Sequence, residues 1–252
     1  MVYAPGSLIS DMQSTVIKRM AYRYCFISKP QEEPIFQERL MEFTYHPGFS
    51  LSQKQKSIQS LHDSIQLNSP SLHILEISSK STNPLGVKLS AFNMIVHSKE
   101  TGKNNLLENV FQSSKVFEKG GPYLDLLQLS PRDAKRDERL KTSGRLQWFE
   151  YEGRKWELEP KSLFYDWLYI NSVSANQTLM DDLQEYNAFT DIEFNHKKSH
   201  NCQARSAAIL VSLMHQNLLD RALGDIEFMK GLYFHSELPA NTSPIDSEKE
   251  SL

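Results

Sequence analysis

This chain has few cysteines, no long apolar run and no large excess of charge of either sign. Its 252 residues include 2 cysteines, Cys25 and Cys202, which lie far apart and indicate no disulfide framework. Such usage is typical of a reducing compartment, so we expect a cytoplasmic protein. No apolar stretch approaches the roughly 18 residues that cross a bilayer, and the start of the chain lacks the layout of a secretory signal. We therefore expect no membrane association.

The charge balance limits how the protein can meet nucleic acid. The formal net charge is -3, so any such contact has to come from a local basic patch. The candidate patch consists of Arg132, Lys135, Arg136, Arg139, Lys141 and Arg145, with acidic residues between them. It could meet a pyrophosphate or a DNA backbone. Mixed runs of this kind are more often a solvated helix face, and that alternative stays open.

Metal-ligand patterns are also lacking. His196, His200 and Cys202 are the only grouping of metal-binding residue types, but their segment reads as a loop without a clear ligand spacing. Cys202 starts an apolar helix, so we expect it to pack there rather than to act as a nucleophile. The sequence predicts no metal and no other cofactor.

What the chain does contain is enough apolar residues for one substantial core. It is 39% hydrophobic and 10% aromatic, which argues against disorder across its body. The hydrophobic spacing predicts strands, a hairpin around Gly153 and helices. The strands are expected at 19–27, 72–79, 87–97 and 188–194, the hairpin at 145–151 and 155–158, and the helices at 51–67, 105–119, 161–173, 178–186 and 201–219.

This mixture predicts an α+β fold, with helices packed around a small mixed sheet in a single domain. Ser50 is the expected N-cap of the helix at 51–67. We expect an N-terminal extension at 1–40, the domain at 41–236, and a disordered tail at 237–252, which is rich in Ser, Pro and Glu.

Three polar residues are spaced to share one face of the helix expected at 105–119. Glu108, Gln112 and Lys115 stand at i, i+4 and i+7, within roughly 60° of each other on a helix. An amine beside a carboxylate in a part-buried groove is the minimum for imine chemistry on a sugar aldehyde, because the amine attacks when its pKa is lowered and the carboxylate moves protons. Spacing alone favours the commoner alternative, a solvated Glu–Lys pair.

The same three residues carry a family resemblance. Glu108-x-x-x-Gln112-x-x-Lys115 resembles the signature of the NADAR superfamily, Glu-His-x-x-Gln-x-x-Lys, with Asn109 in place of the histidine. The role of that imidazole is therefore not carried over. The resemblance continues in order over about residues 86–215. The similar segments are Leu89-Ser90-Ala91-Phe92, Ser130-Pro131-Arg132-Asp133-Ala134-Lys135, Trp156 and Asn201-Cys202-Gln203-Ala204.

Further segments are similar to the NADAR antitoxins encoded beside DarT-type DNA ADP-ribosyltransferase toxins. These segments are 51–58, 86–93, 120–122, 164–171 and 188–195. In that family a lysine is understood to form a Schiff base with the ribose and to release ADP-ribose from a modified guanine. The resemblance implies this role for Lys115, with Glu108 moving protons. It also implies ADP-ribosylated DNA as substrate and a DarT-like toxin as partner.

Residues near the helix expected at 105–119 complete the candidate site. Gln112 could hold a ribose hydroxyl or the base, or could order Glu108. Ser90 and Asn93 follow a predicted strand and could line the same groove, although a buried structural role is equally plausible. Gly120 and Gly121 are expected to stop the helix, and their backbone amides could also lie near a ligand.

Residues later in the chain are weaker candidates. Asp191 and Glu193 are two apart on a predicted strand and so share a face, where one could assist proton transfer; a solvent-facing strand edge explains them nearly as well. Trp167 is a core residue or a base-stacking ring. Asn201 enters through the resemblance.

The sequence thus favours an N-glycosidic hydrolase that removes ADP-ribose from guanine in DNA. Two alternatives remain open. One is a NADAR-type glycosidase that acts on a small ribosylated metabolite. The other is a module that binds ADP-ribose or the toxin without turnover.

Overall fold

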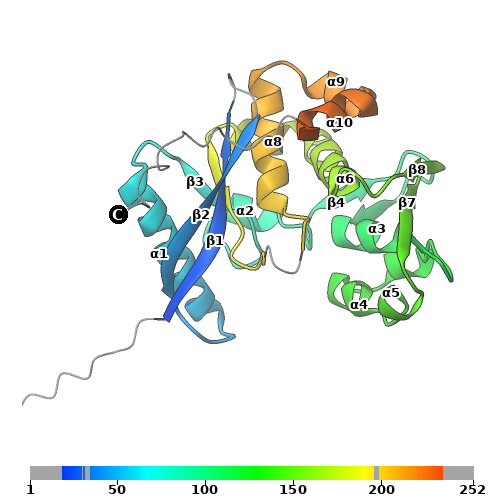
Figure 1. Ribbon diagram of the computed structural model, residues 1–252, viewed down its shortest axis with the longest axis horizontal. Helices are drawn as coiled ribbons and strands as arrows, with labels where there is room; N and C mark the ends of the chain where they lie inside the picture. The colour runs from blue at the N-terminus through cyan, green and yellow to red at the C-terminus, as the bar shows by residue number, and fades with distance from the viewer. Residues whose placement is uncertain (1–18, 30, 32–34, 196–198, 235–252) are drawn as a thin grey trace, which may run out of the picture.

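The computed structural model describes residues 19–29, 31, 35–195 and 199–234 (Figure 1). The tail predicted at 237–252, most of the N-terminal extension and His196 lie outside these residues. The described chain is a single domain of mixed α+β structure, which confirms the predicted fold class.

The largest sheet has four strands in the order β2-β1-β9-β3. β1 (Arg19–Ser28) pairs along its length with antiparallel β2 (Phe36–Tyr45) and, near its end, with β9 (Ala188–Thr190), which runs parallel to β3 (Ile74–Glu76). The boundary expected at residue 40 falls inside β2, and β1 of the same sheet comes from the part of the chain that was expected to be an extension.

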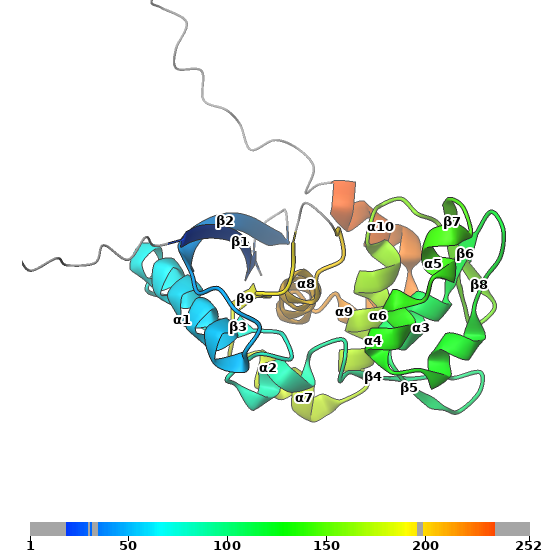
Figure 2. The same cartoon turned by 90° about the horizontal axis from the view of Figure 1, so that it is seen from below.

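Two helices cover the two faces of this sheet (Figures 1 and 2). Successive side chains of a strand point to opposite faces. Cys25 and Ile27 accordingly pack in one cluster with the buried side of α1 (Leu51–Asn68). Phe26 packs in the other with α8 (Gln203–His215).

The rest of the molecule contains several short helices and two small sheets. β4 pairs with β5, and β6-β7-β8 form a three-stranded sheet. The remaining elements are α2 (Pro84–Lys88), β4 (Ile95–His97), β5 (Asn104–Leu106), α3 (Leu107–Ser113), β6 (Lys115–Phe117), η1 (Leu124–Gln128), α4 (Pro131–Arg136), α5 (Arg139–Thr142), β7 (Leu146–Tyr151), β8 (Arg154–Trp156), α6 (Leu163–Ser174), α7 (Gln177–Leu183), α9 (Leu219–Gly224) and α10 (Ile226–Phe234).

Several predicted elements are confirmed. α1 begins after Ser50, whose hydroxyl accepts a hydrogen bond from the Gln53 amide at 3.4 Å. β7 and β8 form the predicted hairpin, with Gly153 at φ +67° in the turn. α6, α7 and α8 begin within two residues of their predicted starts, but α7 ends three residues and α8 four residues before the predicted end. Cys202 directly precedes α8 and is buried, as predicted.

The strand predicted at 87–97 is wrong over most of its length. The first part is helix α2, and only Ile95–His97 form a strand. The reason is helix-start chemistry: the Asn83 side chain accepts a hydrogen bond from the Leu85 amide at 2.9 Å, and Pro84 takes the first helical position. Ser90 and Asn93 therefore lie in the turns after a helix.

The long helix predicted at 105–119 is also wrong. Helix α3 ends at Ser113, and Lys115 opens strand β6, opposite Phe149 of β7. Gly120 and Gly121 do not stop a helix. Gly121 has φ +98°, and a side chain there would collide with the carbonyl oxygen of Lys115. The glycine lets the chain turn back closely against the start of β6.

A buried carboxylate ties three helices together. Asp166 on α6 is fully buried and accepts hydrogen bonds from Ser206 at 2.5 Å, from Arg205 at 2.8 Å and from Tyr233 at 2.6 Å. Ser206 and Arg205 lie on α8 and Tyr233 lies on α10. These bonds hold α6 against α8, which positions one wall of the cavity described below.

We expect Asp166→Ala to lower the free energy of unfolding by about 3–5 kcal/mol, because it leaves the largely buried Arg205 guanidinium without its carboxylate. Urea unfolding followed by circular dichroism measures the change. The control Asp182→Ala, on the exposed side of α7, should stay within about 0.5 kcal/mol of wild type. If both variants unfold at the same urea concentration, the structural role is refuted.

No helix among the described residues is both long enough and apolar enough to cross a membrane.

Candidate active site

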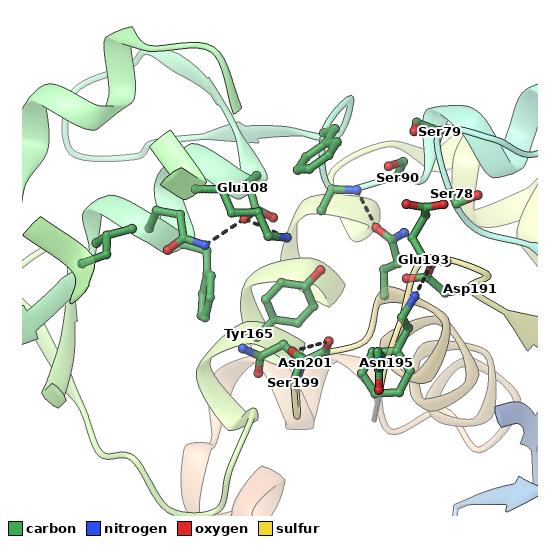
Figure 3. A pocket seen from close by; sticks show the side chains of 18 of the residues that line it. Ser78, Ser79, Ser90, Glu108, Tyr165, Asp191, Glu193, Asn195, Ser199 and Asn201 are labelled. Atoms are coloured by element: carbon green, nitrogen blue, oxygen red, sulfur yellow. Dashed lines mark hydrogen bonds and ion pairs between the residues drawn. The ribbon is translucent and has the colours of Figure 1, made fainter. Parts of the chain in front are cut away.

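A cavity of about 520 Å³ lies where α3, the turn after α2, α4 and α5, and the segment between β9 and α8 meet (Figure 3). Its polar wall residues come from segments far apart in the sequence. They are Ser78, Ser79, Ser90, Glu108, Gln112, Lys115, Lys135, Lys141, Tyr165, Asp191, Glu193, Asn195, Ser199, Asn201 and Gln203.

Glu108, Gln112 and Lys115 form one chain of hydrogen bonds at this cavity. The Gln112 Nε2 group donates to Glu108 Oε1 at 2.8 Å, and Lys115 Nζ donates to Gln112 Oε1 at 2.7 Å. Glu108 and Gln112 lie one turn apart on α3, as their spacing predicted. Lys115 reaches them from strand β6. The three side chains therefore meet, although Lys115 lies outside the helix in which the sequence predicted it.

Burial makes the Lys115 amine easier to deprotonate. Its environment lowers the pKa of Lys115 to about 8: burial is the main cause, the Glu108 carboxylate opposes it, and the Lys135 ammonium adds to it. Lys115 Nζ also lies 4.9 Å from the centre of the Phe111 ring. The solvated-pair alternative does not fit this geometry, because Glu108 is only 5% exposed.

Lys135 on α4 is the second cation at this cluster. Its Nζ lies 3.4 Å from Glu108 Oε1, the same carboxylate oxygen that accepts the hydrogen bond from Gln112. The Lys135 side chain is 56% exposed, which places the ammonium at the solvent side of the carboxylate.

The opposite wall carries Asp191, Glu193 and Asn201. The strand predicted at 188–194 is too long: β9 ends at Thr190 because the Asp191 carboxylate accepts hydrogen bonds from the Glu193 and Phe194 amides and so forms a turn. Asp191 and Glu193 therefore do not share a strand face. Asp191 is buried, whereas Glu193 is half exposed and pairs with Lys54 of α1 at 2.9 Å.

A second buried carboxyl group lies behind Asp191. Glu76 accepts hydrogen bonds from the Thr190 hydroxyl at 2.7 Å and the Ile192 amide at 2.9 Å. Burial raises the pKa of Asp191, and the nearby Glu76 raises it further; burial likewise raises the pKa of Glu76. Two buried carboxyl groups in proximity favour a retained proton, so this wall can donate as well as accept hydrogen bonds.

Four sequence candidates lie away from the cavity wall. Asn93 donates a hydrogen bond to the Val87 carbonyl at 2.9 Å within its own turn. Trp167 packs against Trp156 with 4.6 Å between ring centres, so it is part of the core. Gly120 and Gly121 shape the turn behind Lys115. Ser90 does line the cavity.

Other wall residues were not candidates in the sequence. Tyr165 presents its ring between Glu108 and Asn201 (Figure 3), and packs edge-on against Phe111 at 5.1 Å. Gln203 donates to the Ile77 carbonyl at 2.6 Å and accepts from the Ala91 amide at 2.8 Å, so it joins two walls. The available signal for Gln203 was its place in the segment 201–204, which carries the family resemblance.

Within the described ranges no group of three His, Cys, Asp or Glu side chains is placed to hold a metal ion.

An α+β domain with a buried Glu–Gln–Lys cluster at the wall of a cavity defines a protein of the NADAR superfamily. A family model described as DarT1-associated NADAR antitoxin matches residues 21–242. Because this match covers most of the 252 residues, the chain belongs to the family of DarT1-associated NADAR antitoxins. No curated protein matches the chain.

We expect Lys135→Ala to raise the pKa of Lys115, because the substitution removes a nearby cation and leaves Glu108 without its solvent-side partner. The pH dependence of Lys115 acylation by a small reagent, followed by peptide mass spectrometry, measures this pKa. The midpoint should move up from about 8, and acylation at neutral pH should slow several-fold. Lys56→Ala on α1 is the control. An unchanged midpoint in Lys135→Ala would show that Lys135 does not tune the amine.

Proposed function

We propose that this protein hydrolyses the N-glycosidic bond between ADP-ribose and guanine in DNA, through a Schiff base on Lys115. The observation that carries the proposal is the hydrogen-bonded chain from Lys115 through Gln112 to Glu108, at the wall of a cavity of about 520 Å³. That volume falls within the range of ligand sites, roughly 300–1,000 Å³.

The protonation of Lys115 supports a nucleophilic role. With a pKa of about 8, roughly a quarter of the amine is neutral at pH 7.5. At the ordinary lysine value of 10.5, only about one molecule in a thousand would be neutral. Burial therefore raises the reactive fraction by more than two orders of magnitude, which is the usual route to a lysine nucleophile.

The proposed reaction proceeds in three balanced steps. First the ribose ring opens: the C1′–O4′ bond breaks, O4′ takes a proton from Glu108, and C1′ becomes an iminium carbon bonded to guanine. The Lys115 amine then adds to C1′. The proton on the added Lys115 nitrogen passes to the guanine nitrogen, the C1′–N bond to guanine breaks, and C1′ is then bonded to Lys115 as a protonated imine.

Water completes the cycle. It adds to C1′ of the imine, Lys115 departs as the amine, and the aldehyde closes again to ADP-ribose. One water is consumed, and unmodified guanine is restored. Glu108 serves as acid and then as base, and Gln112 positions it relative to Lys115 through one hydrogen bond to each side chain.

Family membership supports the biological setting that we propose. The matched family is named for association with DarT1, so we propose that the chain acts in the cytoplasm as antitoxin to a DarT-like DNA ADP-ribosyltransferase and repairs the base that the toxin modifies. A small ribosylated metabolite as substrate, or binding without turnover, would be outcomes of the following test.

The first test uses a DNA oligonucleotide that carries ADP-ribose on guanine, with mass spectrometry of the products. Wild type should restore unmodified guanine, and Lys115→Ala and Lys115→Arg should not, because arginine keeps the charge but forms no imine. Borohydride should trap ADP-ribose on the Lys115 peptide of wild type. Turnover of ADP-ribosylated deoxyguanosine alone would favour the metabolite alternative, and binding without turnover would favour the binding module.

A second variant tests the role of Glu108. Glu108→Gln keeps the hydrogen bond to Gln112 but cannot move a proton, so kcat should fall by about 10²–10⁴-fold with little change in KM. The same change removes a charge that raises the pKa of Lys115, so the amine becomes more reactive. If Glu108 only tuned the amine, activity at neutral pH would increase, which would refute the acid–base role. Glu118→Gln, in a surface ion pair, is the control.

A further inference from the structure

The basic residues between 130 and 145 divide into two groups in the structure. Arg139 pairs with Asp125 and Asp137, and Arg145 pairs with Glu118. These two guanidinium groups are held by acidic neighbours and stabilise the segment itself.

The second group is Arg132, Arg136 and Lys141. All three are exposed, and none makes an ion pair with a described residue. On α4, Arg132, Lys135 and Arg136 lie within an arc of roughly 100°, and the buried Ala134 points the other way. The helix thus presents one basic face to solvent.

This basic face adjoins the cavity. Lys135 reaches Glu108 at 3.4 Å from α4, and Leu140 and Lys141 of the α5 segment line the cavity itself. Figure 2 shows α4 and α5 beside α3, at the end of the molecule away from α1. A ligand chain that leaves the cavity on this side would pass over the basic face.

An exposed aromatic ring stands at the same edge. Phe92 lines the cavity and is nevertheless 36% exposed. Lys135 Nζ lies 5.3 Å from the centre of the ring. A ring that is partly in the cavity and partly in solvent offers a face to a base at the mouth.

We propose that Phe92, the exposed Arg132 and Arg136 of α4, and the exposed Lys141 of α5 form a platform for the DNA strand that carries the modified guanine. This proposal rests on the proposed function and adds the recognition of the polymer to it. The basic side chains contact phosphates on the strand, and Phe92 stacks on the base next to the modified nucleotide, which itself enters the cavity.

The charge distribution favours a nucleic-acid strand as the occupant. The whole chain has a formal net charge of -3, so DNA is not attracted by a general field. Three cations without acidic partners, gathered beside an exposed ring, supply the two contacts by which proteins hold single strands: phosphate neutralisation and stacking.

Binding tests the basic face independently of catalysis. Fluorescence anisotropy with an unmodified single-stranded oligonucleotide measures affinity across salt concentrations. Each lost phosphate contact reduces the magnitude of the slope of log K against log salt by about 0.7. The combined variant Arg132→Ala, Arg136→Ala, Lys141→Ala should therefore have a slope smaller in magnitude by about 2 than that of wild type. The matched control is Arg19→Ala, Lys56→Ala, Arg221→Ala, which removes the same residue types from other exposed positions. Equal slopes in the two variants would overturn the platform.

Kinetics test Phe92. In Phe92→Ala, kcat/KM should fall about tenfold on the modified oligonucleotide and stay unchanged on ADP-ribosylated deoxyguanosine, which has no neighbouring base. Tyr22→Ala, which removes an exposed ring from β1, is the control. An equal loss on both substrates, or no loss on either, would overturn the stacking role. If wild type turns over neither substrate, the proposed function is refuted. The anisotropy measurements with the unmodified oligonucleotide would still test whether the platform binds DNA.

Discussion

A helix of seven residues that is buried along its whole length has to satisfy its polar side chains from within the protein, and α3 imposes this constraint on the site. Ser113 and Ser114 donate to the Val110 carbonyl, and Asn109 donates to the carbonyls of Leu126 and Leu129. Asn109 thereby fastens η1 to α3. Glu108 and Gln112 have no such backbone partners among the described residues, and they pair with each other through the Gln112 Nε2 group. The amide oxygen of Gln112 then accepts a hydrogen bond from the Lys115 amine. The cluster thus consists of two α3 side chains that pair with each other and one amine that reaches them from β6.

The same cluster contains an electrostatic balance. Burial favours a neutral Lys115, the Glu108 carboxylate favours a charged one, and Lys135 shifts the balance back by pairing with Glu108 at the solvent side. A pKa of about 8 is the result of these opposing effects. A fully buried ion pair would have kept the amine protonated, and a fully buried lone amine would have had nothing to move protons for it. The half-exposed Lys135 therefore lets one cavity hold both a carboxylate and an amine with a lowered pKa.

Elements marked by local chemistry were predictable from the sequence. Ser50 before a helical apolar stripe predicted α1, and Gly153 between two alternating runs predicted the β7–β8 hairpin. The i, i+4 spacing of Glu108 and Gln112 predicted their contact. The position of Lys115 on a strand was not predictable, because the residues around it are also compatible with a helix. The strand forms because β6 pairs with β7, which is a tertiary contact. Lys135 and Phe92 reach the cavity through tertiary packing, which local sequence does not encode. Asn83-Pro84, by contrast, is a helix-start signal in the sequence, and the strand predicted at 87–97 did not take it into account.

The cavity wall draws on the chain from Ser78 to Gln203 and closes only when β3, α3, α4, α6 and α8 have all docked. Sites assembled from distant segments depend on slow, long-range loop closure during folding. A nascent or partly unfolded chain therefore lacks the complete cavity, and a single proteolytic cut between these residues separates segments that form its wall together. In a cell, catalytic capacity would follow the amount of intact, fully folded chain and not the amount synthesised. Turnover of the protein by proteases would thus act on its function directly, without a dedicated regulatory site.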